Sequence, residues 1–328
     1  MTIILSLVLI AIGIVALIYG SDFLIDNAAR LAKRLGVSAL LIGLTVVAFG
    51  TSAPELAASL MAVLQGFPDL SMGNVIGSNI ANLALILGVA AIIYPLSASM
   101  GFVRRDLPFM LLAGLLLIPI TLDLDGNGLG QIGRLEGALL FGLLIIYITV
   151  LLRSDEPSEI EEVAQELAQN DDKTLGRMLL LAGFGIILLV AGAQALVKGA
   201  SDLARIFGVS ERIIGLTLVA IGTSLPELAA SIAAARKKQG DIIIGNLVGS
   251  NIFNIFSIIG ITAMVKPFNT RPEILNVDFW IMMAVSILVS VILFRTLRFN
   301  RPQGVMMLVI YGIYIAYLAV TQFAISQG

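Results

Sequence analysis

The sequence contains no cysteine and no histidine among its 328 residues. Without cysteine, disulfide bonds and thiolate metal sites are excluded, and without histidine the imidazole ligands and the usual proton relay near neutral pH are excluded as well. Any metal ion that the chain binds must therefore accept oxygen ligands. There is also no Walker-type G-x-x-x-x-G-K-[ST] segment, so the sequence gives no sign of ATP-driven pumping.

Charged residues are scarce as well. Lys, Arg, Asp and Glu together make up 13% of the chain, hydrophobic residues make up 58%, and the mean hydropathy is +1.01. This composition, with its long apolar runs, excludes an ordinary soluble domain and predicts a polytopic membrane protein. The net charge of −2 is too small to indicate a nucleic-acid partner.

Ten apolar segments are long enough to span a membrane, since about 17–25 residues cross about 30 Å of hydrocarbon. The first apolar run, Ile3–Tyr19, lacks a basic n-region and a small-residue cleavage site, so we interpret it as a retained helix. Gly, Ser, Thr, Asn and Pro interrupt the second, third, seventh and eighth segments. The predicted helices cover residues 3–26, 40–64, 70–94, 107–122, 134–152, 175–198, 211–235, 242–265, 276–294 and 304–325.

The basic residues predict the orientation of these helices. If both termini face outward, fourteen Lys and Arg residues lie in the inner loops and six lie outside, which is the asymmetry that the positive-inside rule expects. The inner group is Arg30, Lys33, Arg34, Arg104, Arg105, Arg153, Lys173, Arg177, Arg236, Lys237, Lys238, Arg295, Arg298 and Arg301, and the outer group is Arg134, Lys198, Arg205, Arg212, Lys266 and Arg271. We therefore expect both termini to be extracytoplasmic.

An internal repeat decides the predicted architecture. Gly20–Gly88 aligns without a gap with Gly192–Gly260, at one constant offset (227 − 55 = 172), and about half of the paired residues are identical. Five predicted spans separate equivalent points, and because five is odd the two halves must be inverted about an axis in the membrane plane. Inverted repeats usually hold a substrate site between them near the middle of the membrane.

The predicted fold is an all-α integral membrane protein with ten transmembrane helices, arranged as two inverted five-helix repeats. The first repeat covers residues 1–152, an acidic cytoplasmic linker covers 153–174, and the second repeat covers 175–328. The linker either forms a solvated, partly helical tether or binds a regulatory cation weakly, and composition does not separate these alternatives. Its acidic residues are Asp155, Glu156, Glu159, Glu161, Glu162, Glu166, Asp171 and Asp172.

The first repeated motif places a glutamate inside each half of the membrane region. It reads GTSAPELAAS at residues 50–59 and GTSLPELAAS at residues 222–231, with Glu55 and Glu227 at equivalent positions. An ionisable side chain at bilayer depth costs at least ~2.5–3.5 kcal/mol, so the pair indicates a functional site with a cation as its partner. The alternative is a proline kink with glycines for close packing and a glutamate that bonds to a neighbour.

The prolines and hydroxyls of this motif predict further ligands. Pro54 and Pro226 lack an N–H group, so each should break its helix and free carbonyl groups near Gly50 and Gly222. Broken backbone persists in a membrane only where it is buried in protein or lines a watery cavity. Side-chain oxygens would join these carbonyls in an oxygen cage of the kind that Ca²⁺ and Na⁺ require. They come from Thr51, Ser52 and Glu55 in one half and from Thr223, Ser224 and Glu227 in the other.

A second repeated motif offers neutral oxygens. GNVIGSNIAN at residues 73–82 matches GNLVGSNIFN at residues 245–254. Ser78 and Asn82 are four residues apart and share one face of a helix, as do Ser250 and Asn254. These residues either contribute to the cage or hold membrane helices together, since small and polar residues also serve that purpose.

The two motifs resemble those of the sodium/calcium exchanger family, whose repeats carry G-T-S-x-P-E and G-N-x-x-G-S-N. The resemblance implies that Glu55 and Glu227 are the central Ca²⁺ ligands, assisted by Thr51 and Thr223. It also implies flanking Na⁺ sites from Ser52, Ser78, Ser224, Ser250 and the carbonyl groups of Ala48 and Ala220. Asn254 stands where some relatives carry aspartate, which argues against a potassium requirement.

We therefore expect a Na⁺-driven Ca²⁺ antiporter, not an enzyme, in a prokaryotic cytoplasmic (inner) membrane. It would transport Ca²⁺ and Na⁺ without a cofactor, and it would function as a monomer. The alternatives are an antiporter for Ca²⁺ or another divalent cation driven by H⁺, and a channel or non-transporting binding protein. The proton-driven protein would work without sodium, and the channel would carry current without counter-transport.

Two further acidic features are less informative. Residues 123–128 (DLDGNG) fit the first half of an EF-hand loop, but Arg134 occupies the twelfth position, where a bidentate glutamate is required. We interpret this segment as an external turn. Asp22 and Asp26 lie near the inner end of the first predicted helix, close to Arg30, and either have a surface role or line an ion path.

Overall fold

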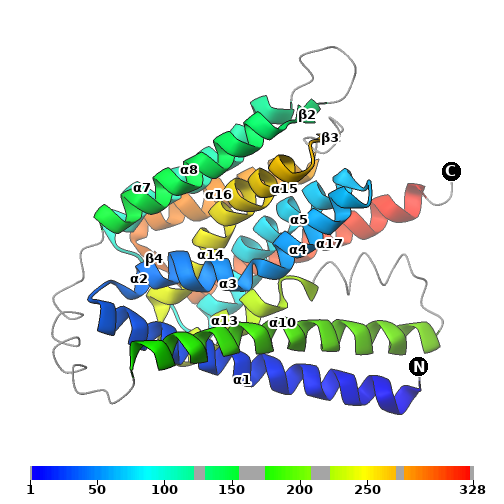
Figure 1. Cartoon of the computed structure of the whole chain (residues 1–328), viewed down its shortest axis with the longest axis horizontal. Helices are drawn as coiled ribbons and strands as arrows, with labels where there is room; N and C mark the ends of the chain where they lie inside the picture. The colour runs from blue at the N-terminus through cyan, green and yellow to red at the C-terminus, as the bar shows by residue number, and fades with distance from the viewer. Residues whose placement is uncertain (1, 122–129, 155–173, 208–221, 271–276, 326–328) are drawn as a thin grey trace.

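The computed structural model describes residues 2–121, 130–154, 174–207, 222–270 and 277–325 (Figure 1). The first half of the chain contains α1 (Ile3–Leu35), α2 (Ala39–Ile42), the π-helix η1 (Gly43–Val47), α3 (Ala48–Thr51), α4 (Ala53–Leu64), α5 (Pro68–Ile80), the π-helix η2 (Ala81–Ile86), α6 (Leu87–Ile93), α7 (Met100–Thr121) and α8 (Arg134–Arg153). The second half contains α10 (Leu175–Ile206), α13 (Leu225–Arg236), α14 (Gly240–Phe253), the π-helix η4 (Asn254–Ile259), α15 (Gly260–Val265), α16 (Val277–Thr296) and α17 (Arg301–Ile325).

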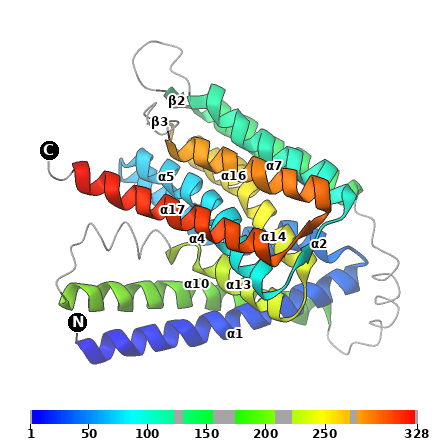
Figure 2. The same ribbon diagram turned by 180° about the vertical axis from the view of Figure 1, so that it is seen from behind.

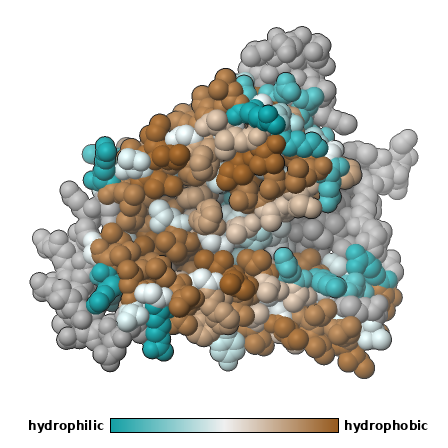
Figure 3. All heavy atoms as spheres, viewed as in Figure 1, coloured by the Kyte–Doolittle hydropathy of each residue, from teal (hydrophilic) through white to brown (hydrophobic). Residues whose placement is uncertain are grey.

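The helices confirm the predicted membrane class. Seven helices among the described residues are long and apolar enough to cross a membrane, and the bent pair Ala39–Thr51 and Ala53–Leu64 gives an eighth if it counts as one span. Hydrophobic side chains cover most of the middle of the face in Figure 3, and hydrophilic ones gather mainly toward its ends. The chain is therefore a multi-pass membrane protein.

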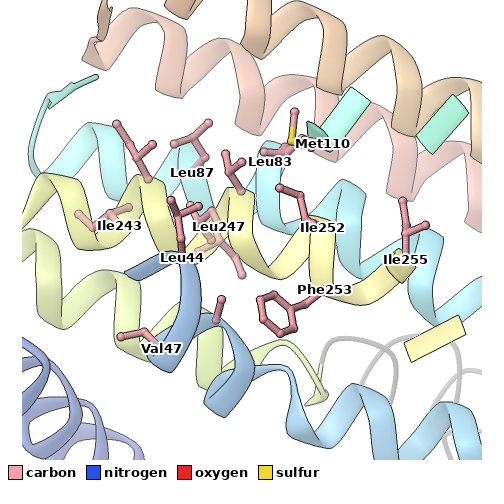
Figure 4. Close-up of a cluster of buried hydrophobic side chains, with 14 of the residues drawn as sticks. Leu44, Val47, Leu83, Leu87, Met110, Ile243, Leu247, Ile252, Phe253 and Ile255 are labelled. Atoms are coloured by element: carbon pink, nitrogen blue, oxygen red, sulfur yellow. The ribbon is translucent and has the colours of Figure 1, made fainter. Parts of the chain in front are cut away.

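The helices divide into a buried centre and an outer layer. In the most apolar 18-residue window of the segment α14–α15 every residue is buried, and in α5–α6 72% are buried, against 22% in α1 and 17% in α17. Figure 4 shows α14 side chains such as Leu247 and Ile252 packed among Leu44, Leu83 and Met110 from other elements. The segments that carry the second repeated motif therefore lie at the centre of the molecule.

The two longest helices, α1 and α10, pack side by side in opposite directions (Figures 1 and 2). Glycines allow this approach at intervals of seven residues: a Cβ atom added at Gly13 would lie 2.7 Å from the carbonyl oxygen of Gly192, and one added at Gly20 would lie 2.9 Å from that of Gly185. Such small residues let membrane helices approach closely. Substitution by any larger residue would separate the pair.

Two short antiparallel ribbons were not predicted. Strand β1 (Leu96–Ser97) pairs with β4 (Arg298–Phe299), and β2 (Gly130–Ile132) pairs with β3 (Phe268–Thr270). Each ribbon joins one half of the chain to the other. Segments of two or three residues carry no periodic signal, so sequence patterns could not reveal them.

Several predicted helix boundaries were wrong. Helix α1 continues to Leu35 and α10 to Ile206, past the predicted ends at 26 and 198, because hydrophobic length marks the hydrocarbon core and not the end of a helix. Helix α7 begins at Met100 and not at 107, since it includes the charged residues that closed the apolar segment. The start of the predicted helix 211–235 lies partly outside the described residues.

Candidate cation-binding site

The first repeated motif forms a break in the helix, as the prolines predict. Helix α3 ends at Thr51 and α4 begins at Ala53, with a bend of 43° between the two segments. Pro54 and Glu55 lie in the first turn of α4, where N–H groups have no partner within the helix. Pro226 and Glu227 occupy the same positions in the first turn of α13. The N-terminus of a helix carries partial positive charge, so it stabilises the carboxylate of each glutamate.

The two glutamates are buried together and bind across the halves. The side chains of Glu55 and Glu227 belong to residues that are each 1% exposed, and their carboxylates repel each other. The hydroxyl of Ser224 donates to Oε1 of Glu55 over 3.4 Å, and the hydroxyl of Ser52 donates to Oε1 of Glu227 over 3.2 Å. A hydroxyl cannot neutralise a buried carboxylate, so this pair needs positive charge.

The threonines of the motif also reach the opposite half. The hydroxyl of Thr51 lies 3.2 Å from Oδ1 of Asn246 and 3.1 Å from the carbonyl oxygen of Val47, and its single proton can serve only one of them. The hydroxyl of Thr223 lies 3.4 Å from Oδ1 of Asn74. Each broken helix is therefore joined to the asparagine of the other half's second motif.

Six buried oxygens form three pairs related by the repeat, and none has a hydrogen-bond partner among the described residues. They are Oε2 of Glu55 and Glu227, Oγ of Ser78 and Ser250, and Oδ1 of Asn82 and Asn254. Buried polar atoms in proteins nearly always have a partner, so a symmetric set of unpartnered oxygens indicates a ligand. Hard cations such as Ca²⁺ take six to eight oxygen ligands, and these atoms fit that chemistry.

Helix packing brings the carriers of these oxygens together. Helix α4, with Glu55, packs against η4, and α13, with Glu227, packs against η2. Asn254 opens η4, and Asn82 is the second residue of η2. Single π-turns inside α-helices are frequent at functional sites because they leave part of the backbone ladder loose.

One predicted ligand keeps its helical hydrogen bond. The carbonyl oxygen of Ala48 accepts the backbone N–H of Ser52 over 3.0 Å, and its second lone pair can still face a cation. The group that loses its partner is the carbonyl of Gly50, since Pro54 has no N–H to donate to it. Ala220 lies outside the described residues, so its carbonyl is not placed.

The other acidic features have different outcomes. Lys237, at the end of α13, binds Oδ1 of both Asp22 and Asp26 at 2.8 Å, which agrees with a surface role for the two aspartates. Partial burial opposes the charge of Lys237, but its hydrogen bonds to Asp22 and Asp26 prevail and raise its pKa above the ordinary 10.5. The loop at residues 123–128 and the acidic linker at 155–173 lie outside the described residues.

A third buried carboxylate provides a contrast. Asp106 in α7 is fully buried, and its Oδ2 lies 2.9 Å from Nη2 of Arg105, while the hydroxyl of Tyr147 in α8 donates to its Oδ1 over 3.0 Å. This carboxylate has a guanidinium partner within the protein, so it needs no external cation. Arg105 was predicted to lie on the inner side of the membrane, and no role was predicted for Asp106.

The site also includes asparagines of the second motif for which the sequence predicted no role. Asn74 donates from Nδ2 to the carbonyl oxygen of Glu55 over 3.3 Å and to Oγ of Ser59 over 3.0 Å. Asn79 and Asn251 bond to each other and to Asn82 and Asn254. The sequence pattern that could have revealed them is that each asparagine occurs at the same position in both copies of the second motif.

Comparisons with known proteins agree with this geometry. A family model described as sodium/calcium exchanger protein matches residues 5–153 and 178–320. The chain belongs to the sodium/calcium exchanger family. The sodium/calcium exchanger MaX1 of Methanosarcina acetivorans is 34% identical over 343 residues, which covers 95% of this chain and 98% of the relative. Inner membrane protein YrbG of Escherichia coli is 36% identical over 320 residues, with 96% of each chain covered.

A solved structure extends the match to three dimensions. The sodium-calcium exchanger NCX_Mj, soaked with zero Na⁺ and Ca²⁺, superposes with a TM-score of 0.82 and 31% identity, covering 97% of this chain and 100% of that one. The resemblance inferred from the two motifs is therefore confirmed. The sodium/calcium exchanger family is a family of transporters, and its match to the present chain supports a cation/Ca²⁺ antiporter.

Proposed function

We propose that the chain exchanges Na⁺ for Ca²⁺ across the membrane by alternating access. The observation that carries this proposal is the set of six buried oxygens without partners among the described residues, in three pairs related by the repeat, one of which belongs to the glutamates of opposite halves. Two carboxylates supply a charge of −2, which one Ca²⁺ balances, and the neutral oxygens can replace the hydration shell of Ca²⁺ or Na⁺. The family match and the name of the relative MaX1 support sodium as the counter-ion.

The proposed ligands are those predicted from the sequence, with one change of emphasis. Glu55 and Glu227 are central, and hydroxyl and amide oxygens complete the cage from Thr51, Thr223, Ser52, Ser224, Ser78, Ser250, Asn82 and Asn254. Backbone carbonyls are expected from Gly50, to which Pro54 can donate no N–H group, and from Ala48, which keeps a second lone pair beside its bond to Ser52. The carbonyl of Ala220 stays a prediction.

The proposed architecture is ten transmembrane helices in two inverted repeats, residues 1–152 and 175–328, joined by the linker 153–174. It is supported by the order of the described elements, since each half has a long helix, a helix that begins with the proline and glutamate of the first motif, a segment with a π-turn, a strand and two more helices with a strand between them. The start of α1 and the end of α17 lie at the same end of the molecule in Figures 1 and 2, as an even number of spans requires. We place that end outside the inner membrane, and we expect a monomer to suffice because one chain supplies both halves of the cage.

Flux measurements with separate gradients test the function. The purified protein is reconstituted into liposomes, and Ca²⁺ uptake is followed under an outward Na⁺ gradient or under a pH gradient without sodium. We expect uptake with the Na⁺ gradient only. Uptake that persists without sodium and follows the pH gradient would instead identify the proton-driven antiporter, and current without counter-transport would identify a channel.

A further inference from the structure

Two asparagines of the second motif hold each other through main-chain atoms. Nδ2 of Asn79 donates to the carbonyl oxygen of Asn251 over 3.4 Å, and Nδ2 of Asn251 donates to the carbonyl oxygen of Asn79 over 3.3 Å. Asn79 is 2% exposed and Asn251 is 1% exposed. This reciprocal pair joins α5 to α14 at the buried centre of the molecule.

The main-chain partners fix which way both amides point. A carbonyl oxygen can only accept, so the atom of Asn79 that faces it must be the nitrogen, and Oδ1 of Asn79 must be the outward acceptor. Nδ2 of Asn254 donates to that Oδ1 over 2.9 Å. In the same way, Oδ1 of Asn251 accepts Nδ2 of Asn82 over 3.0 Å. The orientation of all four amides therefore follows from two backbone carbonyls.

In Asn82 and Asn254 the amide nitrogen is used in these hydrogen bonds, so the amide oxygen is the atom that remains available to a ligand. Oδ1 of both residues is buried and has no hydrogen-bond partner among the described residues. If either amide were turned over, it would present two N–H donors, which repel a cation, in place of a ligand oxygen. Its own Oδ1 would then face Oδ1 of Asn79 or Asn251, and two acceptor oxygens have no proton to share.

We propose that Asn79 and Asn251 are positioning residues that determine which atom of Asn254 and Asn82 faces the transported cation. Each positioning residue acts on the opposite half of the chain. Asn79 of the first half orients the amide of Asn254 in the second half, and Asn251 of the second half orients the amide of Asn82 in the first. The inference rests on the proposed function, because it assigns the unpartnered oxygens to cation binding. Residues that hold a metal ligand in this way typically change affinity for the ion by about 10–100-fold when they are replaced.

Double-mutant cycles on the purified full chain test the crossed pairs. Radioactive Ca²⁺ is bound at equilibrium and its Kd is measured by dialysis. Asn79→Ala removes the acceptor for Asn254 but keeps the backbone carbonyl that holds Asn251, so Asn82 stays oriented. We expect a rise in Kd of about tenfold. In an Asn254→Ala background Asn79→Ala should change Kd no further, whereas in an Asn82→Ala background the full rise should remain.

The mirrored cycle provides an independent measurement if one variant fails to fold. Asn251→Ala should be silent in an Asn82→Ala background and effective in an Asn254→Ala background. A loss of general stability would act alike in both backgrounds, so it cannot produce this crossed pattern. Effects that add equally in both backgrounds, with wild-type Ca²⁺ binding intact, would overturn the positioning role alone. Absence of Ca²⁺ binding by the wild type would overturn the proposed function and this inference with it.

Discussion

The two copies of the repeated motifs carry the same asparagine and serine at equivalent positions, but these residues bond differently. In the first half, Nδ2 of Asn74 donates both to the carbonyl oxygen of Glu55 and to Oγ of Ser59. In the second half, Nδ2 of Asn246 and Oγ of Ser231 occupy the equivalent positions, and among the described residues neither has a hydrogen-bond partner. The difference comes from conformation and not from composition, since the four residues are two identical pairs.

This asymmetry has an energetic meaning. A buried polar group without a partner costs about 1–3 kcal/mol, so the second half pays a penalty that the first avoids. Antiporters with inverted repeats work by moving one repeat or bundle against the other around a fixed site. Under the alternating access proposed above, such a difference between Asn74 with Ser59 and Asn246 with Ser231 is the asymmetry expected of one end state of the motion.

The largest effect on Ca²⁺ transport is expected at Glu55 and Glu227, where the two halves carry the same buried residue. Glu55→Gln or Glu227→Gln leaves one negative charge for a divalent ion, so either variant should abolish Ca²⁺ transport while the protein still inserts and purifies. Uptake into reconstituted vesicles measures this. Ser286→Ala is a suitable control, because the Ser286 hydroxyl is buried and donates to the carbonyl oxygen of Met282 within its own helix. Normal Ca²⁺ uptake by either glutamine variant would remove that glutamate from the cage.

A smaller but distinctive effect is expected when a third carboxyl enters the cage. Asn254→Asp places a carboxyl group opposite Oδ1 of Asn79, on the π-helix that packs against the Glu55-bearing α4, so it has to bind a proton or a further cation. We expect no potassium requirement in the wild type, and in the variant a new dependence of Ca²⁺ transport on pH or on potassium. Sodium-driven flux is measured with and without potassium from about pH 6 to about pH 8.

The matched variant Asn82→Asp sharpens this test. It faces Oδ1 of Asn251 as Asn254→Asp faces that of Asn79, so it should acquire the same dependence. A wild type that requires potassium, or an Asn254→Asp variant that behaves as the wild type, would show that Asn254 lies outside the cage.

Stability should reveal the difference between the halves directly. Asn74→Ala removes two donated hydrogen bonds, whereas Nδ2 of Asn246 has no hydrogen-bond partner among the described residues. With each bond worth about 0.5–1.5 kcal/mol, we expect Asn74→Ala to lower stability by about 1–3 kcal/mol and Asn246→Ala by less. Thermal unfolding in detergent without added Ca²⁺ gives the two Tm values. Equal losses would contradict the asymmetry.

The smallest effect is expected at the partly exposed end of α13. Lys237 pairs with Asp22 and Asp26, and its equivalent in the first half, 172 residues earlier, is the uncharged Gln65. Lys237→Gln makes the two halves alike there and should cost at most about 1 kcal/mol, because the pair is partly exposed.

The pH dependence of that bridge follows from the pKa of Lys237. Its pKa in the folded protein is raised above 10.5, so the stabilisation is fully present below pH 10.5 and is lost as pH rises through the raised value. Tm curves of the wild type and Lys237→Gln should therefore be separate near neutral pH and converge in strongly alkaline buffer. A constant separation would assign the effect to packing.

The sequence predicted the membrane class, the paired glutamates and the helix breaks because each depends on local residue chemistry. The constant offset of 172 also predicted which residues correspond. It could not predict the partners, because Ser52 binds Glu227 of the other half and not Glu55 three residues away. Nor could it predict that Nδ2 of Asn74 has partners while Nδ2 of Asn246 has none among the described residues, since the two residues occupy the same place in the repeated pattern. Such contacts depend on packing between distant segments.

The central claim is that the two halves build one shared site for Ca²⁺. It is tested most directly by titrating the purified wild-type chain with Ca²⁺ by equilibrium dialysis and repeating the titration with added Na⁺. One shared cage predicts a single Ca²⁺ bound per chain, displaced competitively by Na⁺. Two Ca²⁺ bound independently, or binding that Na⁺ leaves unchanged, would contradict it.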